Sequence, residues 1–493
     1  MKRLFLFATA LNLLAPLWGQ EVVRFDTVHQ NVVGSFAVGQ GVYETENGYR
    51  VFSLQKGLAE LSQDIYVTDF DSDGGMLSER TFQSLRQDFF GYASGMVQAG
   101  NGHYGGVVRF GAPYSVDSLL LYRFGEDGDT AWSRFIAVDT SWAYRNISRT
   151  GNGDLLLTGT HYPPGEAYVF RLDSAGAIKS YHGFSGFYGE DVVEGQDGCW
   201  YVGGIGNSGS LINAAVLLRS DTLGNILWQR DLPLYGQYRS LVALRDFGVL
   251  GLGSTGDGED GGFSLAIKYD TTGTQVWRRD LLQSDDQSRA SRFHAGFEAV
   301  DSTLIMCGWL SRADTYTNGT VVKLDKNGEV LWTRLYSHFE VGGVLPWQMF
   351  WDVKPTSDGG LVLTGEANSE DYPYGQLWLL KLDSLGCLVP GCNTVGMEEV
   401  VTDLQGRLSV SPNPASEQAR VELRCPEGFA PQGDVRLVLV DAQGQEISRQ
   451  VMVQNLDRFI ATVDVQSLTS GTYYVHLADE RLWLAGAKLM VEH

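Results

Sequence analysis

The sequence predicts an all-β protein in which one short unit of strands recurs along most of the chain. Glycine is abundant, with 60 residues among 493 against only 13 prolines, which is typical of many tight turns. A turn motif returns at a nearly constant interval, and no stretch shows sustained helical periodicity. Together these observations favour repeated antiparallel strands over helical or mixed folds.

The recurring motif is Asp-x-x-Gly-x-x-x-Trp. Clear copies end at Trp228, Trp277 and Trp332, a variant ends at Trp132, and weaker copies lack the tryptophan. In such a hairpin turn the aspartate side chain caps the backbone, and the glycine supplies the positive φ. The turn glycines follow one another at 48–58 residues and are Gly74, Gly128, Gly176, Gly224, Gly273, Gly328 and Gly386.

Two apolar runs recur at similar positions relative to this turn. One directly precedes the aspartate, as in residues 167–172 and 377–382. The other is short and ends in glycine, at Gly159, Gly203, Gly253, Gly308 and Gly365. Four short strands per unit, repeated seven times, predict a seven-bladed β-propeller over residues 20–392. A β-solenoid is less favoured because its coils are usually shorter. Residues 20–33 are expected to add a strand that closes the ring.

The motif tryptophans have a structural explanation. A large aromatic side chain at the same point of each unit is expected to pack between neighbouring sheets, so we expect Trp132, Trp228, Trp277 and Trp332 to hold blades together. The repeat resembles that of the quinoprotein alcohol dehydrogenases, which place Gly-x-x-x-Trp at the end of a blade. The resemblance covers the motif alone, since this sequence has no adjacent cysteine pair. No cofactor is expected.

Both ends of the chain carry segments of another kind. Residues 1–19 read as a signal peptide, with Lys2 and Arg3 before an apolar stretch at 4–17. Residues 393–403 form a polar, acidic connector. The whole chain carries 59 acidic and 37 basic residues, a net charge of −22. Such a charge repels phosphate backbones, so nucleic acid is not an expected partner.

Residues 404–493 contain four short motifs in order: Ser411-Pro412-Asn413-Pro414, a turn that ends at Gly444, Leu468-Thr-Ser-Gly471-Thr-Tyr473, and Lys488-Leu-Met-Val. Together they resemble the type A C-terminal sorting domain of type IX secretion in Bacteroidota. The resemblance implies a small immunoglobulin-like β-sandwich. It also implies recognition by the outer-membrane translocon and sorting machinery, and a location at the cell surface or outside the cell.

Few residues suggest site chemistry. Cys387 and Cys392 lie close together in a Gly/Pro turn, and we expect an exported protein to oxidise them to a disulfide. The segment Asp69-Phe-Asp71-Ser-Asp73-Gly74 resembles the start of a calcium loop, in which alternate carboxylates meet at the ion. The glutamate expected at the twelfth position is absent, and the segment falls where other units have their hairpin turn. A structural turn is therefore favoured over a calcium site.

The sequence favours a non-catalytic role. It contains no His-Glu-x-x-His zinc motif and no serine nucleophile elbow. A propeller presents loops around a channel, which suits a binding or structural module for a glycan or a protein. The alternative is a carbohydrate-active or other hydrolytic enzyme with its site at the channel mouth. The side chains that line the channel entrance discriminate between the two, because fold alone does not specify function.

Overall fold

The protein is described by a computed structural model in which every named element is a β-strand. No helix among the described residues is long and apolar enough to cross a membrane. The expected signal peptide, the connector 393–403 and Cys392 lie outside the described residues. The structure describes residues 24–29, 36–56, 63–82, 96–99, 102–111, 115–137, 142–161, 165–208, 211–256, 262–282, 288–312, 317–339, 347–368, 375–388, 404, 407–425, 431, 433–442, 444–479 and 483–493.

The first three sheets of the repeat region each contain four consecutive antiparallel strands. The first sheet contains β2 (Phe36–Thr45), β3 (Gly48–Lys56), β4 (Gln63–Asp71) and β5 (Met76–Phe82). The second contains β6 (Met96–Ala99), β7 (Gly102–Gly111), β8 (Ser115–Phe124) and β9 (Thr130–Ala137). The third contains β10 (Trp142–Arg149), β11 (Leu155–His161), β12 (Glu166–Leu172) and β13 (Ile178–Ser185).

The next sheet has seven strands because one long strand serves two units. β17 (Ile226–Ala243) pairs with β16 along its first part and with β18 along its second. The other strands of this sheet are β14 (Phe187–Glu194), β15 (Trp200–Ser208), β16 (Leu211–Ser220), β18 (Val249–Gly256), β19 (Phe263–Tyr269) and β20 (Gln275–Leu281). The following four-stranded sheet contains β21 (Ser288–Glu298), β22 (Leu304–Arg312), β23 (Thr317–Leu324) and β24 (Val330–Tyr336).

The last sheet of the repeat region joins the two ends of that region. Its own strands are β25 (Gln348–Pro355), β26 (Leu361–Ala367) and β27 (Gln376–Leu382), and its fourth strand is β1 (Phe25–His29) from the start of the chain. Phe25 pairs with Lys381 and His29 with Leu377 in antiparallel register. The expectation that a strand from residues 20–33 joins the end of the repeat is thus confirmed.

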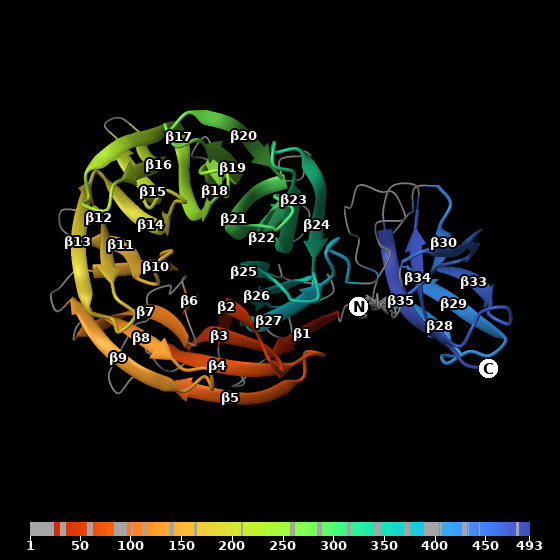
Figure 1. The fold of residues 1–493 in the computed structure, drawn as a ribbon. Helices are drawn as coiled ribbons and strands as arrows, with labels where there is room; N and C mark the ends of the chain where they lie inside the picture. Colours follow the sequence, from red (N-terminus) through yellow and green to blue (C-terminus); the bar gives the residue numbers. More distant parts are fainter. Residues whose placement is uncertain are drawn as a thin grey trace, which may run out of the picture.

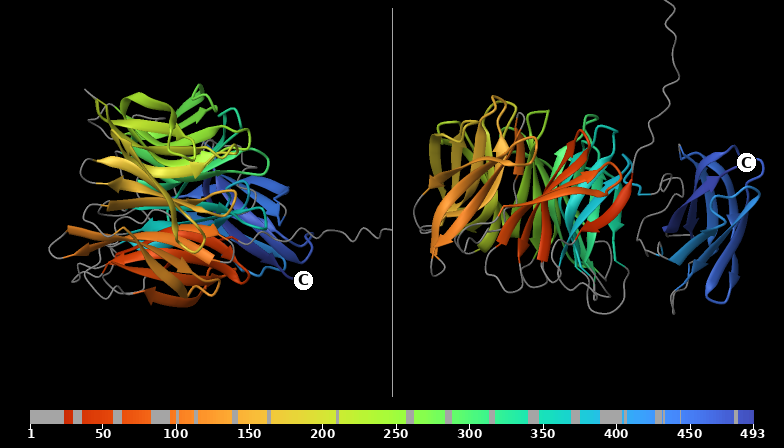
Figure 2. Two further views of the ribbon diagram at one scale, coloured as in Figure 1. Left: turned by 60° about the vertical axis from the view of Figure 1, so that its left-hand side comes forward. Right: turned by 90° about the horizontal axis from the view of Figure 1, so that it is seen from below.

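The sheets stand in a ring around a common centre, which makes the fold propeller-like (Figure 1). β2, β6, β10, β14, β21 and β25 lie nearest the centre, and β5, β9, β13 and β24 lie at the rim. The side views in Figure 2 show the sheets standing side by side around that centre. The buried cores lie between sheets: one cluster contains Phe52 of β3, Phe124 of β8 and Tyr168 of β12.

The turn motif has the local structure that its sequence predicts. All seven turn glycines have φ between 74° and 84°, which side chains disfavour. In the turn at Asp325, the aspartate carbonyl accepts from the Gly328 amide at 3.0 Å, and carboxylate Oδ1 accepts from the amides of Asn327 and Glu329 at 2.8 Å. The same capping contacts recur at Asp71, Asp173, Asp221, Asp270 and Asp383.

Each turn glycine is covered by a large side chain from the preceding sheet or unit. A Cβ added to Gly328 would lie 2.8 Å from the ring of Trp277, and one added to Gly273 would lie 2.8 Å from Trp228. The glycine therefore lets an aromatic ring lie directly on the neighbouring turn. The remaining pairs are Phe25 on Gly74, Arg50 and Arg80 on Gly128, Trp132 on Gly176, His182 on Gly224 and Trp332 on Gly386.

Polar contacts fix the tryptophans in place. Trp277 Nε1 donates to the carbonyl of Lys326 at 3.3 Å, and the Arg279 guanidinium lies 5.9 Å from the centroid of the same indole. Arg279 Nε also donates to the carbonyl of Gly328 at 2.8 Å. An arginine two residues after the tryptophan makes the same ring contact at Arg134, Arg230 and Arg334. Trp277 is buried, whereas Trp132, Trp228 and Trp332 are half-buried.

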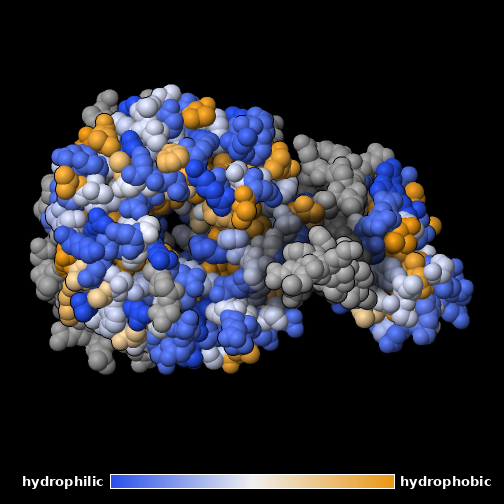
Figure 3. Space-filling model, in the orientation of Figure 1, coloured by the Kyte–Doolittle hydropathy of each residue, from blue (hydrophilic) through white to orange (hydrophobic). Residues whose placement is uncertain are grey.

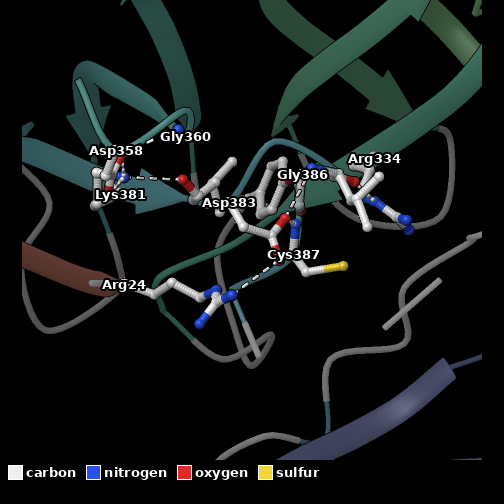
Figure 4. A network of polar contacts seen from close by, with 11 residues as sticks. Arg24, Arg334, Asp358, Gly360, Lys381, Asp383, Gly386 and Cys387 are labelled. Carbon is white, nitrogen blue, oxygen red and sulfur yellow. Dashed lines mark hydrogen bonds and ion pairs between the residues drawn. The ribbon is translucent and has the colours of Figure 1, made fainter. Parts of the chain in front are cut away.

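The last turn also binds the start of the chain (Figure 4). Arg24, just before β1, donates from Nη2 to Asp383 Oδ2 at 3.2 Å. Asp383 uses its other oxygen to cap the turn that leads to Gly386 and Cys387. Beside it, the fully buried Lys381 donates to Asp358 Oδ2 at 2.9 Å. The same aspartate thus stabilises a local turn and a contact between the first and last parts of the ring.

Residues after the connector form two further four-stranded sheets that share one hydrophobic core. Val421 and Leu423 face Leu437 and Val475 within it. The first sheet contains β28 (Leu408–Ser411), β29 (Gln418–Arg424), β33 (Arg458–Asp464) and β32 (Val453–Asn455). The second contains β31 (Glu446–Val451), β30 (Arg436–Asp441), β34 (Gly471–Ala478) and β35 (Trp483–Val491).

Two glycines provide a matched test of the ring-on-turn contact. Gly328 and Gly359 both have φ +83°, but a Cβ on Gly359 would meet no atom within 4 Å. Gly359→Ala is expected to lower the free energy of unfolding by about 1–2 kcal/mol, from the positive φ alone. Gly328→Ala is expected to lose about 1–3 kcal/mol more, because the methyl group displaces the Trp277 ring. Urea unfolding measures both, and equal losses would show that the ring contact contributes nothing to stability.

Candidate functional site

A cavity of about 580 Å³ lies where the innermost strands of the ring meet. It is lined by residues of β2, β6, β10, β14, β17, β21 and β25, so every unit contributes to it. The space-filling view shows the ring hollowed at this centre (Figure 3). Its volume falls in the range of small-molecule sites, about 300–1,000 Å³. This cavity is the candidate functional site.

A β-bulge interrupts six of the innermost strands at the same level. In β25, for example, Phe350 pairs with Gly365 and Asp352 with Thr364, so Trp351 is left without a partner in the ladder. A bulged residue is free to point away from the sheet. The six residues, here called the bulge ring, are Gln40, Arg145, Glu190, Arg239, His294 and Trp351. The seventh innermost strand is β6. It pairs with β7 without a bulge over its described residues.

The glycines that end the second-strand runs make room for these bulges. A Cβ on Gly365 would lie 1.9 Å from the carbonyl oxygen of Met349, and one on Gly253 would lie 1.9 Å from that of Gln237. A Cβ on Gly159 or Gly308 would likewise meet a backbone carbonyl oxygen of the neighbouring strand. The same holds for Gly204, one residue after the predicted Gly203. In the sequence, all of these glycines except Gly204 mark the repeat. Their spacing is the signal that could have located the bulge ring.

In two units the residue after the bulge is an aspartate that ties neighbouring sheets and units together. Asp191 Oδ2 accepts from the backbone amide of Leu241 at 2.6 Å, and its Oδ1 accepts from Asn146 Nδ2 and the Val192 amide, each at 2.7 Å. Burial raises the pKa of Asp191 to about 7, although these hydrogen bonds oppose the shift. Asp352 repeats the arrangement, since its Oδ2 accepts from the Val42 amide at 3.1 Å.

The described carboxylates of the cavity wall are all engaged by donors. Asp352 Oδ1 accepts from the Val353 amide at 3.0 Å and from Lys354 Nζ at 2.6 Å. Glu44 accepts from the amide and hydroxyl of Ser357, both at 2.7 Å. Asp191 accepts the three hydrogen bonds given above. These side chains hold the scaffold together.

The bulge ring combines charge with aromatic surface. Arg239 donates to Glu190 Oε2 at 2.7 Å, and Arg145 Nε lies 3.4 Å from Glu190 Oε1. His294 stacks on Trp351, with centroids 4.1 Å apart and planes inclined by 13°. Burial, with the charges of Arg292 and Arg239, lowers the pKa of His294 to about 3, so the imidazole is neutral at physiological pH.

The predicted calcium residues have other roles here. Asp71 caps its turn like the other turn aspartates. Asp69 binds Arg50 at 2.6 Å and Arg80 at 3.0 Å, the two arginines that cover Gly128. Asp73 is exposed. Among the described residues, no group of three or more His, Cys, Asp or Glu side chains is placed to hold a metal ion. These placements fit the structural turn that the sequence favours over a calcium site.

The described cysteines differ in whether they form a disulfide. Cys387 is disulfide-bonded, while its expected partner lies outside the described residues. Cys199, Cys307 and Cys425 are free, and Cys307 is fully buried in the core. Burial raises the pKa of all three thiols, which disfavours the reactive thiolate.

Three of the four C-terminal motifs meet at the last strand, β35. Asn413, between Pro412 and Pro414, donates from Nδ2 to the Lys488 carbonyl and accepts from the Met490 amide, both at 2.8 Å. Gly471 pairs with Val491 at the other side of β35. Tyr473 anchors the preceding turn through a 3.0 Å hydrogen bond to the Thr469 carbonyl. The Gly444 turn stands apart, in the β30–β31 hairpin, with φ +81°.

Comparisons with solved structures give likenesses of low identity. A protein of unknown function from Bacteroides caccae is 13% identical, with a TM-score of 0.39, 62% of this chain covered and 94% of that one. PorZ, a surface component of the type-IX secretion system of Porphyromonas gingivalis, is 11% identical, with a TM-score of 0.39. The match to PorZ covers 95% of this chain and 60% of that one. The β-propeller domain of the Trilobed protease from Pyrococcus furiosus is 9% identical, with a TM-score of 0.41, 71% of this chain covered and 95% of that one.

The family comparison identifies the C-terminal region. No curated protein matches the chain. Residues 409–492 match the secretion system C-terminal sorting domain, over the segment whose motifs meet at β35. A sorting domain of this kind implies interaction with the type IX secretion machinery. The chain therefore ends in a type IX secretion C-terminal sorting domain, which directs it across the outer membrane to the cell surface.

Proposed function

We propose that the repeat region is a seven-bladed propeller that acts as a non-catalytic binding module for an extracellular glycan or protein. The central cavity carries the proposal. Its described carboxylates are occupied by scaffold hydrogen bonds, while Arg239, His294 and Trp351 line it with positive charge and aromatic surface. Such side chains suit recognition of a ligand better than bond cleavage.

The blade count follows from the contacts between units. β17 belongs to two units, so the seven-stranded sheet counts as two blades. Seven turn glycines are each covered by the fourth strand of the unit before, and the first of them, Gly74, is covered by Phe25 of β1. These seven contacts between a side chain and a turn glycine all run in the same direction around the ring, and their number supports seven blades. The two C-terminal sheets with one shared core support an immunoglobulin-like sandwich.

A hydrolytic enzyme is the second candidate, and Glu366 on β26 favours it. Burial raises the pKa of Glu366 to about 7, the range of a general acid. Its one described hydrogen bond comes from Trp351 Nε1, at 3.3 Å. Glu366 is 7% exposed and is absent from the cavity wall. We therefore assign it the role of orienting the Trp351 indole from behind.

Binding without turnover is the first prediction of this proposal. The purified chain is run in affinity electrophoresis gels that contain single polysaccharides or extracellular proteins, and the same ligands are incubated with it in solution. We expect retardation by at least one ligand, and no new products by mass spectrometry. Products that disappear in Glu366→Gln would establish the enzyme instead.

The pH dependence of stability tests the buried state of Glu366. Its folded pKa of about 7 lies above its ordinary value of 4.5, so the unfolded chain releases this proton first as the pH rises. The contribution of Glu366 is therefore complete below pH 4.5 and is lost as the pH rises towards 7. The Glu366→Gln variant keeps an acceptor for Trp351 but does not titrate. We expect the stability of the wild type relative to the variant to fall across this window in urea unfolding, and a flat difference would contradict the buried acid.

Transport across the outer membrane is expected to depend on the sorting domain. A chain without residues 404–493 should keep a folded ring, because the ring core contains no residue beyond the connector. It should remain in the periplasm, since the address for the outer-membrane machinery is missing. Cell fractionation with protease resistance as the folding measure checks both points. Surface display of the truncated chain would contradict the role of the sorting domain, and a protease-sensitive product would contradict the boundary.

A further inference from the structure

Exposed apolar side chains of the sorting domain gather along one short segment. Leu456 is 89% exposed, Val453 70%, Val451 53% and Ile447 43%. All four lie within β31, β32 and the hairpin turn that follows β32. These four residues are here called the apolar edge. Exposed apolar side chains that lie together mark an interaction surface more often than single ones do.

The apolar edge lies at the open side of the sandwich. β31 and β32 are outer strands of their two sheets, and the buried Met452 joins them. In the part of the chain that the structure describes, β31 pairs with β30 alone and β32 with β33 alone. On the opposite side the edge of β35 is covered, because the Ala415 amide donates to the Met490 carbonyl at 2.8 Å. An outer strand without a cover is a ready contact for another chain.

The backbone at Leu456 is strained without a return from packing. Leu456 follows Asn455 in the tight turn between β32 and β33, and its φ is +56°. This left-handed conformation disfavours a leucine, and glycine or asparagine usually occupies such a position. The side chain is nearly all exposed, so its burial offsets none of the strain within the chain. Contact with a partner would offset it.

The charged neighbours of the apolar edge are engaged with one another. Glu446 pairs with Arg449 at 2.7 Å. Arg458 pairs with Glu422 at 2.8 Å and lies 3.7 Å from Asp457. Apolar side chains, flanked by these ion pairs, are therefore what this side of the domain offers to a partner. The matching surface on the partner is an apolar pocket.

We propose that the apolar edge docks the sorting domain onto the outer-membrane machinery of type IX secretion, with Leu456 in an apolar pocket of the receiving protein. The inference rests on the sorting role, because that machinery is the partner that the family match implies for this domain. Four side chains are too small a surface for a stable dimer, in which each partner buries about 800 Å². They suit a contact that must release the chain after transport.

Export of full-length variants from cells with an active type IX system tests the docking surface. Leu456→Asn relieves the strain and removes the apolar contact. We expect its share at the cell surface, measured by cell fractionation, to fall about 10-fold, as for a central interface residue. The thermal midpoint of the purified chain should equal or exceed that of the wild type. Loss of export from a chain that is no less stable separates docking from folding.

The matched control makes the same exchange in the ring. Phe247 also has a positive φ, +70°, and is 53% exposed. Phe247→Asn relieves the same kind of strain outside the sorting domain, so it controls for any effect of stability on transport. We expect it to reach the surface like the wild type. Leu456→Met keeps an apolar side chain and should do the same.

A second variant protects the test against misfolding at the turn. Val453→Thr keeps the shape and the strand preference of its side chain, and it should also lower the surface share. Full surface display of both Leu456→Asn and Val453→Thr would overturn the proposal, and so would midpoints well below the wild type in both. Loss of self-association in light scattering, with export intact, would assign the edge to a second copy of the chain instead. If the chain without residues 404–493 is itself displayed, the sorting role fails; if it is trapped while both variants are displayed, only the docking surface fails.

Discussion

The contact on which the ring depends is a large side chain lying on the bare turn of the next unit. Each turn glycine has a positive φ and no side chain, so the ring of Trp277, for example, can reach the backbone at Gly328. The arginine two residues further on then covers the indole and bonds the same turn. Because every unit both covers a turn and is covered, the contacts run in one direction around the ring. Neighbouring sheets therefore meet at a fixed point and in a fixed orientation, with the apolar cores between them.

In this scaffold, the residues that pack the sheets together are different from the residues that the bulges turn out of the ladder. In five units a glycine of the second strand leaves space for a bulge in the first strand, and in six units a bulge turns one residue out of the ladder. The glycines that make room for these bulges recur from unit to unit. The turned-out residues are of five kinds: Gln40, Arg145, Glu190, Arg239, His294 and Trp351. A repeat of nearly equal units thus builds a cavity with no internal symmetry.

Much of the scaffold could be predicted from sequence, because its signals are local. The turns, their aspartate caps and the first-to-last strand pairing needed only spacing and alternation. In two units the side chain that covers the next turn glycine was not predicted. These side chains are Arg80 and His182, which lie two residues after the expected tryptophan position and on the same face of the strand. The bulge ring could not be predicted directly. A bulge is a property of pairing between two strands, and the pattern of one strand does not reveal which residue the ladder leaves out. For the same reason the sequence could raise Asp69 as a calcium ligand but not show Arg50 and Arg80 beside it.

The pairing of β1 with β27 has a kinetic consequence. Arg24 and Asp383 are 359 residues apart, and their contact requires a loop of that length to close. Such long-range contacts form late and make folding slow. The ring cannot be completed until nearly the whole repeat region has emerged from the machinery that delivers it. In a chain that emerges from its N-terminus, β1 therefore has no partner until β27 has followed it.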